Sequence, residues 1–223
     1  MSEHHSTVET PLALAAHKAE LIATAQAMCT CGLNKGTAGN LSVRVGDGYL
    51  ITPTGMDYAA LTPDDIPYVH FSGEVVGKRQ PSSEWRFHHD VYLARPEAGA
   101  ILHAHSPFAT SLACLRCEIP AFHYMIARFG GDSIRCANYA TFGTQELSDA
   151  AIHALHKRSA CLLANHGMLV FGKNLHNALA LGVELESLCE QYWRACQLGT
   201  PVCLDSAEMA RVLAKFTGYG QPQ

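Results

Sequence analysis

Apolar residues near the start of the chain recur every three or four positions, which is the spacing of a helix with one buried face. A capping threonine and a first-turn proline stand at 10–11, and Gly32 is typical of a helix end. From 40 to about 76 the pattern changes to short runs rich in Val, Ile and Tyr, separated by glycine-containing turns at 46–48 and 72–74. These signals predict one long helix followed by several strands joined by hairpins.

Helical and strand-like patterns alternate through the rest of the chain. Helices are expected near 83–94, after 106–107, after 144, near 174 and after 205, and strands near 100–103, 134–136, 160–164 and 168–171. The alternation predicts a single α/β domain over 1–223, with a mixed, largely antiparallel sheet covered by helices on both faces. We expect residues 1–9 to form a disordered tail and residues 205–223 to form a last helix with a mobile end.

Composition and charge narrow the possible partners. Of the 223 residues 48% are apolar and 16% are charged, which is sufficient for one buried core. The net charge of −4 offers no basic field for nucleic acid or an anionic membrane surface. No apolar run approaches the roughly 20 residues of a membrane span, and the N-terminus does not read as a signal peptide. Nine scattered cysteines, an odd number, indicate reduced thiols in a cytoplasmic protein.

Two histidines at alternate positions are the clearest candidates for metal binding. His103 and His105 stand at the end of a predicted strand, where residues two apart point to the same side of the sheet. His166 occupies a tight turn between two strand-like runs. Three neutral imidazoles with one open position are typical of a catalytic zinc site. The alternative of two edge-strand histidines and a turn residue stays open, as does a rival pair of thiol ligands at Cys114 and Cys117.

Several turns offer groups that bind anions. Ser82 and Ser83 precede a predicted helix, so hydroxyls and unpaired backbone amides meet at its N-terminus. Asn40, Thr54 and Gly55 lie in two other tight turns that allow close backbone approach to a phosphate. Each turn alone is most often structural. Glu84 fits either a general base or an acidic residue at a helix start, and its spacing alone favours the second interpretation.

Other histidines give weaker signals. His88 and His89 are adjacent, and neighbouring residues point apart on a helix, so we do not expect them to act together. His153 and His156 are interpreted as part of a solvated face.

Taken together, these segments resemble the class II aldolase/adducin family over nearly the whole chain. Each motif is short, but all stand in the family's order, which makes the combination specific. The motifs are Gly36-Thr37-Ala38-Gly39-Asn40, Thr52-Pro53-Thr54-Gly55, Pro81-Ser82-Ser83-Glu84, His103-Ala104-His105, His123-Tyr124-Met125 and Asn165-His166-Gly167.

The resemblance implies a zinc-dependent aldolase with one Zn²⁺ per subunit. The zinc ligands would be His103, His105 and His166, and Glu84 would be the acid/base carboxylate. The substrate phosphate would be held by Asn40, Thr54, Gly55, Ser82 and Ser83. The substrate would be a ketose 1-phosphate such as L-fuculose 1-phosphate, cleaved reversibly to dihydroxyacetone phosphate and a short aldehyde such as lactaldehyde.

The resemblance further implies a homotetramer with active sites at subunit interfaces. Tyr124 would reach the site of a neighbouring subunit and contact the aldehyde oxygen. Phe216 and Tyr219 resemble aromatic residues of a C-terminal tail that closes over the site, and Phe142 is a candidate wall for the aldehyde end.

Several alternatives stay open on the sequence alone. The physiological substrate could instead be 5-deoxyribulose or 5-methylthioribulose 1-phosphate, as in nucleoside salvage. A ribulose phosphate 4-epimerase of the same family typically carries Asp where this chain has Glu84. A Schiff-base aldolase needs a buried lysine, and the six lysines all fall in polar settings. A metallohydrolase is a further possibility, because a zinc-bound water can attack an ester. A non-catalytic adducin-like binding protein is least favoured.

Overall fold

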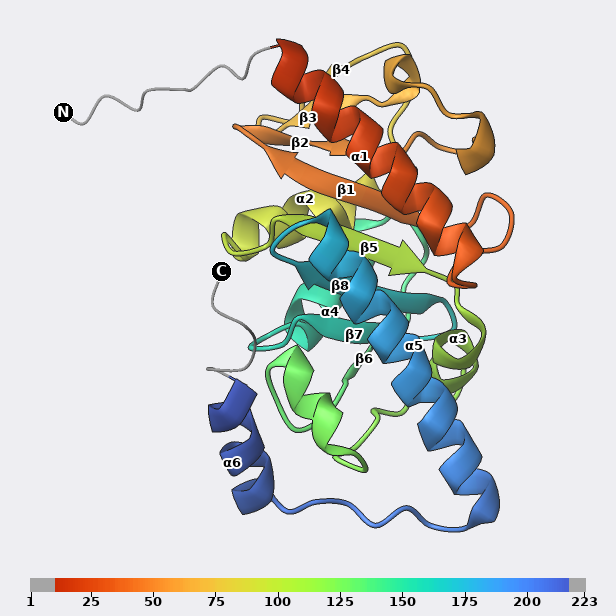
Figure 1. Ribbon diagram of the computed structural model, residues 1–223, viewed down its shortest axis with the longest axis vertical. Helices are drawn as coiled ribbons and strands as arrows, with labels where there is room; N and C mark the ends of the chain where they lie inside the picture. The colour runs from red at the N-terminus through yellow and green to blue at the C-terminus, as the bar shows by residue number, and fades with distance from the viewer. Residues whose placement is uncertain (1–10, 217–223) are drawn as a thin grey trace, which may run out of the picture.

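An eight-stranded sheet runs through the centre of the computed structural model, which describes residues 11–216 (Figure 1). Its order is β4-β3-β2-β1-β5-β8-β7-β6, and every neighbouring pair is antiparallel except β6 and β7. The prediction of a mixed, largely antiparallel sheet is therefore confirmed. The strands are β1 (Asn40–Val45), β2 (Gly48–Ile51), β3 (Tyr68–His70), β4 (Val75–Val76), β5 (Ala100–Ala104), β6 (Cys136–Ala137), β7 (Ala160–Leu163) and β8 (Gly167–Gly172).

Helices cover both faces of this sheet, as the alternating pattern predicts. In Figure 1, α1 (Pro11–Thr30) and α5 (Leu175–Leu198) lie across the near face, and α2 (Trp85–Ala94) and α4 (Gln145–Ala154) lie behind it. The short α3 (Pro107–Ala113) packs beside α5. The last helix, α6 (Ser206–Phe216), packs on the 3₁₀ segment η3 (Tyr124–Phe129). Two further 3₁₀ turns, η1 (Tyr58–Ala60) and η2 (Pro63–Asp65), connect β2 to β3.

The central strands are apolar on both faces, so each face builds its own core. On β5, Leu102 packs into the core under α1 and α5, whereas its neighbour Ile101 packs into the core against α2 and α4. On β8, Val170 and Leu169 divide in the same way. All four are at most 1% exposed, and full burial of such a side chain stabilises the fold by about 1.5–3 kcal/mol.

Strand β1 differs because the face that it turns toward α2 is polar yet buried. Ser42 is fully buried, and Asn40 is 3% exposed. Arg44 donates hydrogen bonds from Nη2 to the Tyr92 carbonyl (2.7 Å) and from Nε to the Ala98 carbonyl (2.9 Å). Buried polar groups are tolerated when they are partnered in this way. The result is a polar strip beneath α2 that leads along β1 to Asn40.

The start of α3 is capped by a side chain from a distant helix. Glu186 on α5 accepts hydrogen bonds from the backbone N–H groups of Phe108 (2.8 Å) and Ala109 (2.9 Å) and from the Ser106 hydroxyl (2.7 Å). A hydrogen bond to a charged group typically contributes about 1.5–3 kcal/mol. This cap fixes the chain immediately after His105.

Some predicted boundaries differ from the structure. The strand expected at 134–136 is shifted, because Ile134 forms only an isolated bridge with Ile119 and the ladder begins at Cys136. The segment η3 was not predicted. The expected N-terminal tail at 1–9 and the end of the chain at 217–223, including Tyr219, lie outside the described residues.

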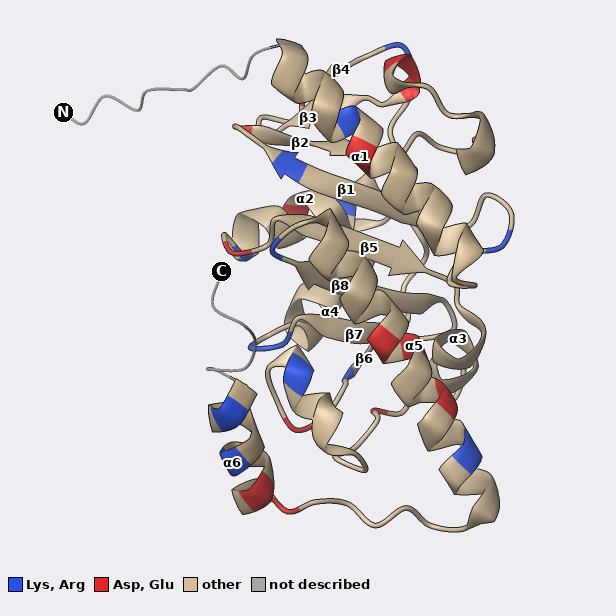
Figure 2. Ribbon diagram, viewed as in Figure 1, with Lys and Arg blue, Asp and Glu red and all other residues tan. Residues whose placement is uncertain are grey.

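Charged residues of both signs share the surface helices. Figure 2 shows acidic and basic positions together on α5 and α6, while β5, β7 and β8 carry neither. Within residues 11–216, none of the helices combines the length and the apolar character needed to cross a bilayer. All nine cysteines fall in this range, and each is a free thiol.

Candidate functional site

Three histidines and one glutamate converge at the end of β5. His103 lies on β5, His105 follows that strand, His166 lies in the turn between β7 and β8, and Glu84 immediately precedes α2. Because β5 and β8 pair antiparallel, the end of β5 lies beside the start of β8 and brings the imidazoles together. The three ring centroids are 4.7–4.8 Å apart, and the four potential ligand atoms lie within 4.8 Å of one another.

The hydrogen bonds of His103 fix which of its nitrogens faces this centre. Its Nδ1 lies 2.9 Å from the Met168 carbonyl oxygen, which can only accept, so Nδ1 carries the proton. The bare Nε2 then points to His105 Nε2 at 2.9 Å and to Glu84 Oε2 at 3.2 Å. Two ring nitrogens and a carboxylate that face one another at these distances need a shared positive charge between them. The donor set therefore fits a divalent cation, with the carbonyl bond that typically orients a ligating histidine.

The electrostatics keep His105 and Glu84 in the forms that bind metal. Burial lowers the pKa of His105 to about 4, and the neighbouring His103 and His166 add to the effect, so its imidazole is neutral near pH 7. Burial alone would raise the pKa of Glu84, but the adjacent His103 and His166 outweigh it and hold that pKa well below its usual range. Glu84 is therefore an ionised carboxylate close to the neutral imidazole of His105.

The position of the Glu84 side chain corrects the interpretation that spacing alone favoured. Although Glu84 is the N-cap residue of α2, its side chain makes no capping hydrogen bond. Its Oε2 instead accepts a hydrogen bond from Asn40 Nδ2 (3.0 Å), and its Oε1 lies 3.1 Å from His166 Nε2. Oε1 is buried without a hydrogen-bond partner. A carboxylate held in this way is available for proton transfer or metal contact.

Beside this cluster is a pocket of about 320 Å³. All the residues predicted to bind phosphate line it: Asn40, Thr54, Gly55, Ser82 and Ser83. A bridge between Pro53 and Pro81 joins the two turns, with the Ser82 N–H donating to the Thr52 carbonyl (3.0 Å). Among the described residues that line the pocket, none is Lys or Arg. An anion here would be bound by hydroxyls, amides and backbone N–H groups.

Gly39 explains how Asn40 comes so close to the histidines. Its φ of +79° lies in the left-handed region, and a Cβ at this position would be 2.7 Å from the His103 carbonyl oxygen. Only glycine fits this close approach. It places Asn40 opposite His103 in the β1–β5 ladder.

The far wall of the pocket is more apolar. Phe142, the expected wall residue, lines it together with Tyr139 and Ala140, and both aromatic side chains are more than half exposed. Tyr139 was not found from the sequence, because it is a single aromatic residue in a loop. The Arg116 guanidinium lies 5.7 Å from the centre of the Tyr139 ring.

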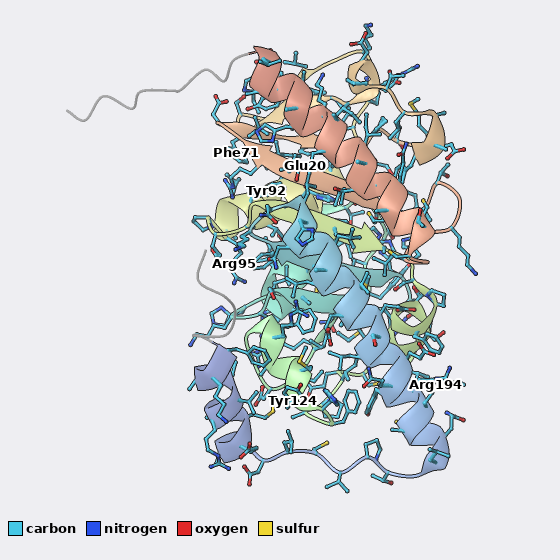
Figure 3. The ribbon with its side chains drawn as sticks, in the orientation of Figure 1. Glu20, Phe71, Tyr92, Arg95, Tyr124 and Arg194 are labelled. Atoms are coloured by element: carbon cyan, nitrogen blue, oxygen red, sulfur yellow. The ribbon has the colours of Figure 1, made fainter. Side chains whose placement is uncertain are left out.

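The remaining predicted residues lie elsewhere within one chain. Tyr124, labelled in Figure 3, is on η3 near α6 and is 51% exposed. It lines a separate groove with Phe216, the last residue of α6. Neither lines the pocket beside Glu84.

A functional neighbour that sequence reasoning set aside is His88. It is fully buried on α2, and its Nε2 lies 2.5 Å from Asn40 Oδ1. The spacing of four residues between Glu84 and His88, which is typical of two side chains on the same side of a helix, was the available signal.

Comparison with known proteins agrees with this geometry. The family model described as the class II aldolase and adducin N-terminal domain matches residues 19–193. A 5-methylthioribulose-1-phosphate/5-deoxyribulose-1-phosphate aldolase of Rhodospirillum rubrum is 57% identical over 200 residues, covering 90% of each chain. The L-fuculose phosphate aldolase of Escherichia coli K12 is 47% identical over 202 residues, covering 90% of this chain and 94% of the relative.

A solved structure shares the fold. It is an L-fuculose 1-phosphate aldolase with a TM-score of 0.88 and 43% sequence identity, covering 91% of this chain and 96% of that one.

Proposed function

The chain belongs to the class II aldolase and adducin family and is an aldolase, a carbon–carbon lyase, and we propose that it reversibly cleaves a ketose 1-phosphate into dihydroxyacetone phosphate and a short aldehyde. One observation carries this proposal. Three imidazoles and a carboxylate converge beside a pocket lined with hydroxyl and amide groups. Such a site can bind an anionic substrate next to both a cation and a base.

The proposed metal is Zn²⁺, one per subunit, with His103, His105 and His166 as ligands. Three histidines with a further position open are typical of catalytic zinc, and the bare Nε2 of His103 supports the assignment. When bound, the cation supplies Lewis-acid stabilisation of the negative charge that develops on the substrate oxygens.

The proposed phosphate site consists of Asn40, Thr54, Gly55, Ser82 and Ser83. These residues supply hydroxyl, amide and backbone N–H donors from three segments that meet at one pocket. Binding the phosphate there would hold the three-carbon half of the substrate beside the histidines. Reacting groups that are held in a fixed geometry react as if they belonged to one molecule, which lowers the barrier.

Glu84 is the proposed acid/base group. In condensation it would remove a proton from carbon 3 of dihydroxyacetone phosphate, and that carbon would then attack the aldehyde carbonyl. In cleavage the carbon 4 hydroxyl gives its proton to the group that protonates the aldehyde oxygen in condensation, the bond between carbons 3 and 4 breaks, and the Glu84 carboxyl returns its proton to carbon 3. The buried Oε1 without a hydrogen-bond partner supports this role.

Two substrate classes fit this reaction, and they differ in the aldehyde half. Cleavage between carbons 3 and 4 releases lactaldehyde from L-fuculose 1-phosphate. It releases acetaldehyde or methylthioacetaldehyde from the 5-deoxy and 5-methylthio pentulose phosphates. The 57% identity to the Rhodospirillum rubrum relative favours the pentulose phosphates, and the apolar wall of Tyr139, Ala140 and Phe142 is consistent with a substituent lacking hydroxyls.

We also propose a homotetramer with active sites at subunit interfaces. Tyr124 is exposed and away from the pocket of its own chain, so a role in hydrogen bonding or protonating the aldehyde oxygen requires a neighbouring copy. The mass of the assembly, measured by light scattering, should be about four times that of one chain, whereas a monomer at working concentration would exclude this use of Tyr124. A cytoplasmic location is proposed from the nine free thiols.

The decisive experiment supplies dihydroxyacetone phosphate with each aldehyde and identifies the condensed sugars, with and without Zn²⁺. We expect condensation that depends on zinc. We also expect kcat/KM to be about tenfold or more higher for acetaldehyde and methylthioacetaldehyde than for lactaldehyde. One changed substrate group in a pocket typically alters kcat/KM by about 10–200-fold. Interconversion of pentulose phosphates without release of dihydroxyacetone phosphate would indicate an epimerase instead. Hydrolysis of phosphate esters without carbon–carbon bond formation would contradict the proposal.

A further inference from the structure

A buried chain of hydrogen bonds runs from Glu84 to the interior of the α2 layer. Glu84 Oε2 contacts Asn40 Nδ2 (3.0 Å), and Asn40 Oδ1 contacts His88 Nε2 (2.5 Å). His88 Nδ1 contacts the Ser42 hydroxyl (2.7 Å), which contacts the Tyr92 hydroxyl (2.8 Å). Asn40 is the most exposed of the four residues behind Glu84, at only 3%. Each of the four side chains behind Glu84 therefore has a hydrogen-bond partner within this chain of contacts.

The direction of each hydrogen bond follows from the carboxylate at one end. An ionised Glu84 can only accept, so Asn40 must turn its NH₂ group toward Glu84 and its carbonyl oxygen toward His88. The Asn40 oxygen can also only accept, so the proton of His88 must be on Nε2. Nδ1 then accepts from the Ser42 hydroxyl, whose oxygen in turn accepts from Tyr92. The direction is thus the same at every link.

His88 itself is held in place by its surroundings. The Phe87 ring stacks on it at 4.8 Å and 24°, and the same ring packs edge-on against His103 at 5.4 Å. An unpaired buried donor or acceptor costs about 1–3 kcal/mol. Turning the Asn40 amide over would set its oxygen against the Glu84 carboxylate and its NH₂ against the His88 N–H. It would thus break two hydrogen bonds at once, so His88 prevents that rotation.

The two oxygens of Glu84 become inequivalent as a result. Oε2 is occupied as the acceptor of the Asn40 amide, whereas Oε1 is buried without a hydrogen bond and lies toward His166. We propose that His88 is a positioning residue for proton transfer: through Asn40 it reserves Oε2 as an acceptor and leaves Oε1 as the oxygen that takes and returns the substrate proton. This inference rests on the proposed aldolase function and adds a residue that touches neither the substrate nor the metal ligands.

The protonation pattern can be tested on the unmodified enzyme. We expect ¹⁵N NMR of the histidine-labelled, zinc-loaded protein to show His88 with a protonated Nε2 and a bare Nδ1, assigned by the loss of that signal in His88→Gln. A bare Nε2 with a protonated Nδ1 would reverse the direction of the hydrogen bonds and overturn the proposal. The tautomer is read on the wild-type enzyme, and the conservative variant serves only to assign the signal.

Variants then test the consequence for proton transfer, followed as exchange of the carbon 3 proton of dihydroxyacetone phosphate with D₂O. His88→Leu should lower the exchange rate about 10–100-fold, as loss of an outer partner commonly does. His88→Gln, whose amide can donate to Asn40 and accept from Ser42, should recover most of the rate. KM should change much less than the exchange rate in both, because Thr54, Gly55, Ser82 and Ser83 still line the phosphate pocket.

The matched control is His89→Leu, the same substitution one residue along α2. His89 packs among Tyr49, Phe71 and Trp85, outside the chain of contacts. The His89→Leu enzyme should therefore exchange the substrate proton at the wild-type rate. Zinc content per chain should be equal in all four proteins. If wild-type enzyme exchanges no proton, the aldolase proposal fails. If it does exchange and His88→Leu matches it, or if His88→Gln is no faster than His88→Leu, the role of His88 is refuted.

Discussion

Replacing Glu84 with glutamine should lower kcat by about 10²–10⁴-fold, the usual contribution of a general acid/base group, while metal stays bound. Glutamine keeps the length and shape of the side chain but takes up no proton. The Asn40 amide donates to the atom at the Oε2 position, so the glutamine oxygen should settle there. Its NH₂ group then occupies the Oε1 position near His166, where the wild-type enzyme has its free base.

The measurement is steady-state cleavage together with metal content and KM. Zinc content should match the wild type, since the three imidazoles remain, and KM should change much less than kcat because the phosphate pocket is intact. Glu20→Gln, which alters an exposed carboxylate on α1 (Figure 3), serves as the control and should leave turnover unchanged. Wild-type turnover in Glu84→Gln would show that another group moves the proton.

Local periodicity was sufficient to predict most of the fold. Apolar residues at helical spacing place α1 and α5, and two short apolar runs around a turn place β7 and β8. The edge of the sheet was harder to predict. Strand β6 has only two residues and pairs parallel to β7, so its register depends on distant contacts rather than on its own sequence.

The candidate site was predictable where neighbours in sequence share a direction. His103 and His105 are two apart on a strand end, and the turn with His166 follows from its position between two paired strands. Glu84 was ambiguous because an acid before a helix has a common structural role. The structure distinguishes an acid/base group from a helix cap, since the Glu84 carboxylate makes no capping bond and faces the imidazoles.

The polar network behind Glu84 was beyond sequence reasoning for a physical reason. Alternating polar residues on a strand, such as Asn40, Ser42 and Arg44, ordinarily face water, and here they are covered by α2. Their partners are 44 or more residues away in sequence, so only the tertiary structure reveals that Asn40 and Ser42 are buried and that all three side chains are paired. Tyr124 presents the opposite difficulty, because within one chain it lines a groove separate from the pocket beside Glu84.

Removal of the metal should abolish activity, and its return should restore it. Lewis-acid stabilisation of the developing charge is worth several kcal/mol, so chelated enzyme should lose about 10³-fold or more in rate. Added Zn²⁺ should recover it. Because a cation that binds only the folded state stabilises that state, the chelated protein should also unfold at a lower temperature. Treatment with borohydride in the presence of substrate should have no effect, since no lysine lines the pocket among the residues described.

His103→Ala tests the dependence on metal by removing one of the proposed ligands. His103 is fully buried and places its bare Nε2 at the centre of the cluster, so its loss should lower zinc occupancy and activity in parallel. His153→Ala, which removes an exposed imidazole on α4, should change neither quantity. The two readouts together distinguish a ligand from a residue needed only for folding, because excess Zn²⁺ should partly rescue a weakened site but not a misfolded one. Full activity in His103→Ala without bound metal would require a different source of charge stabilisation.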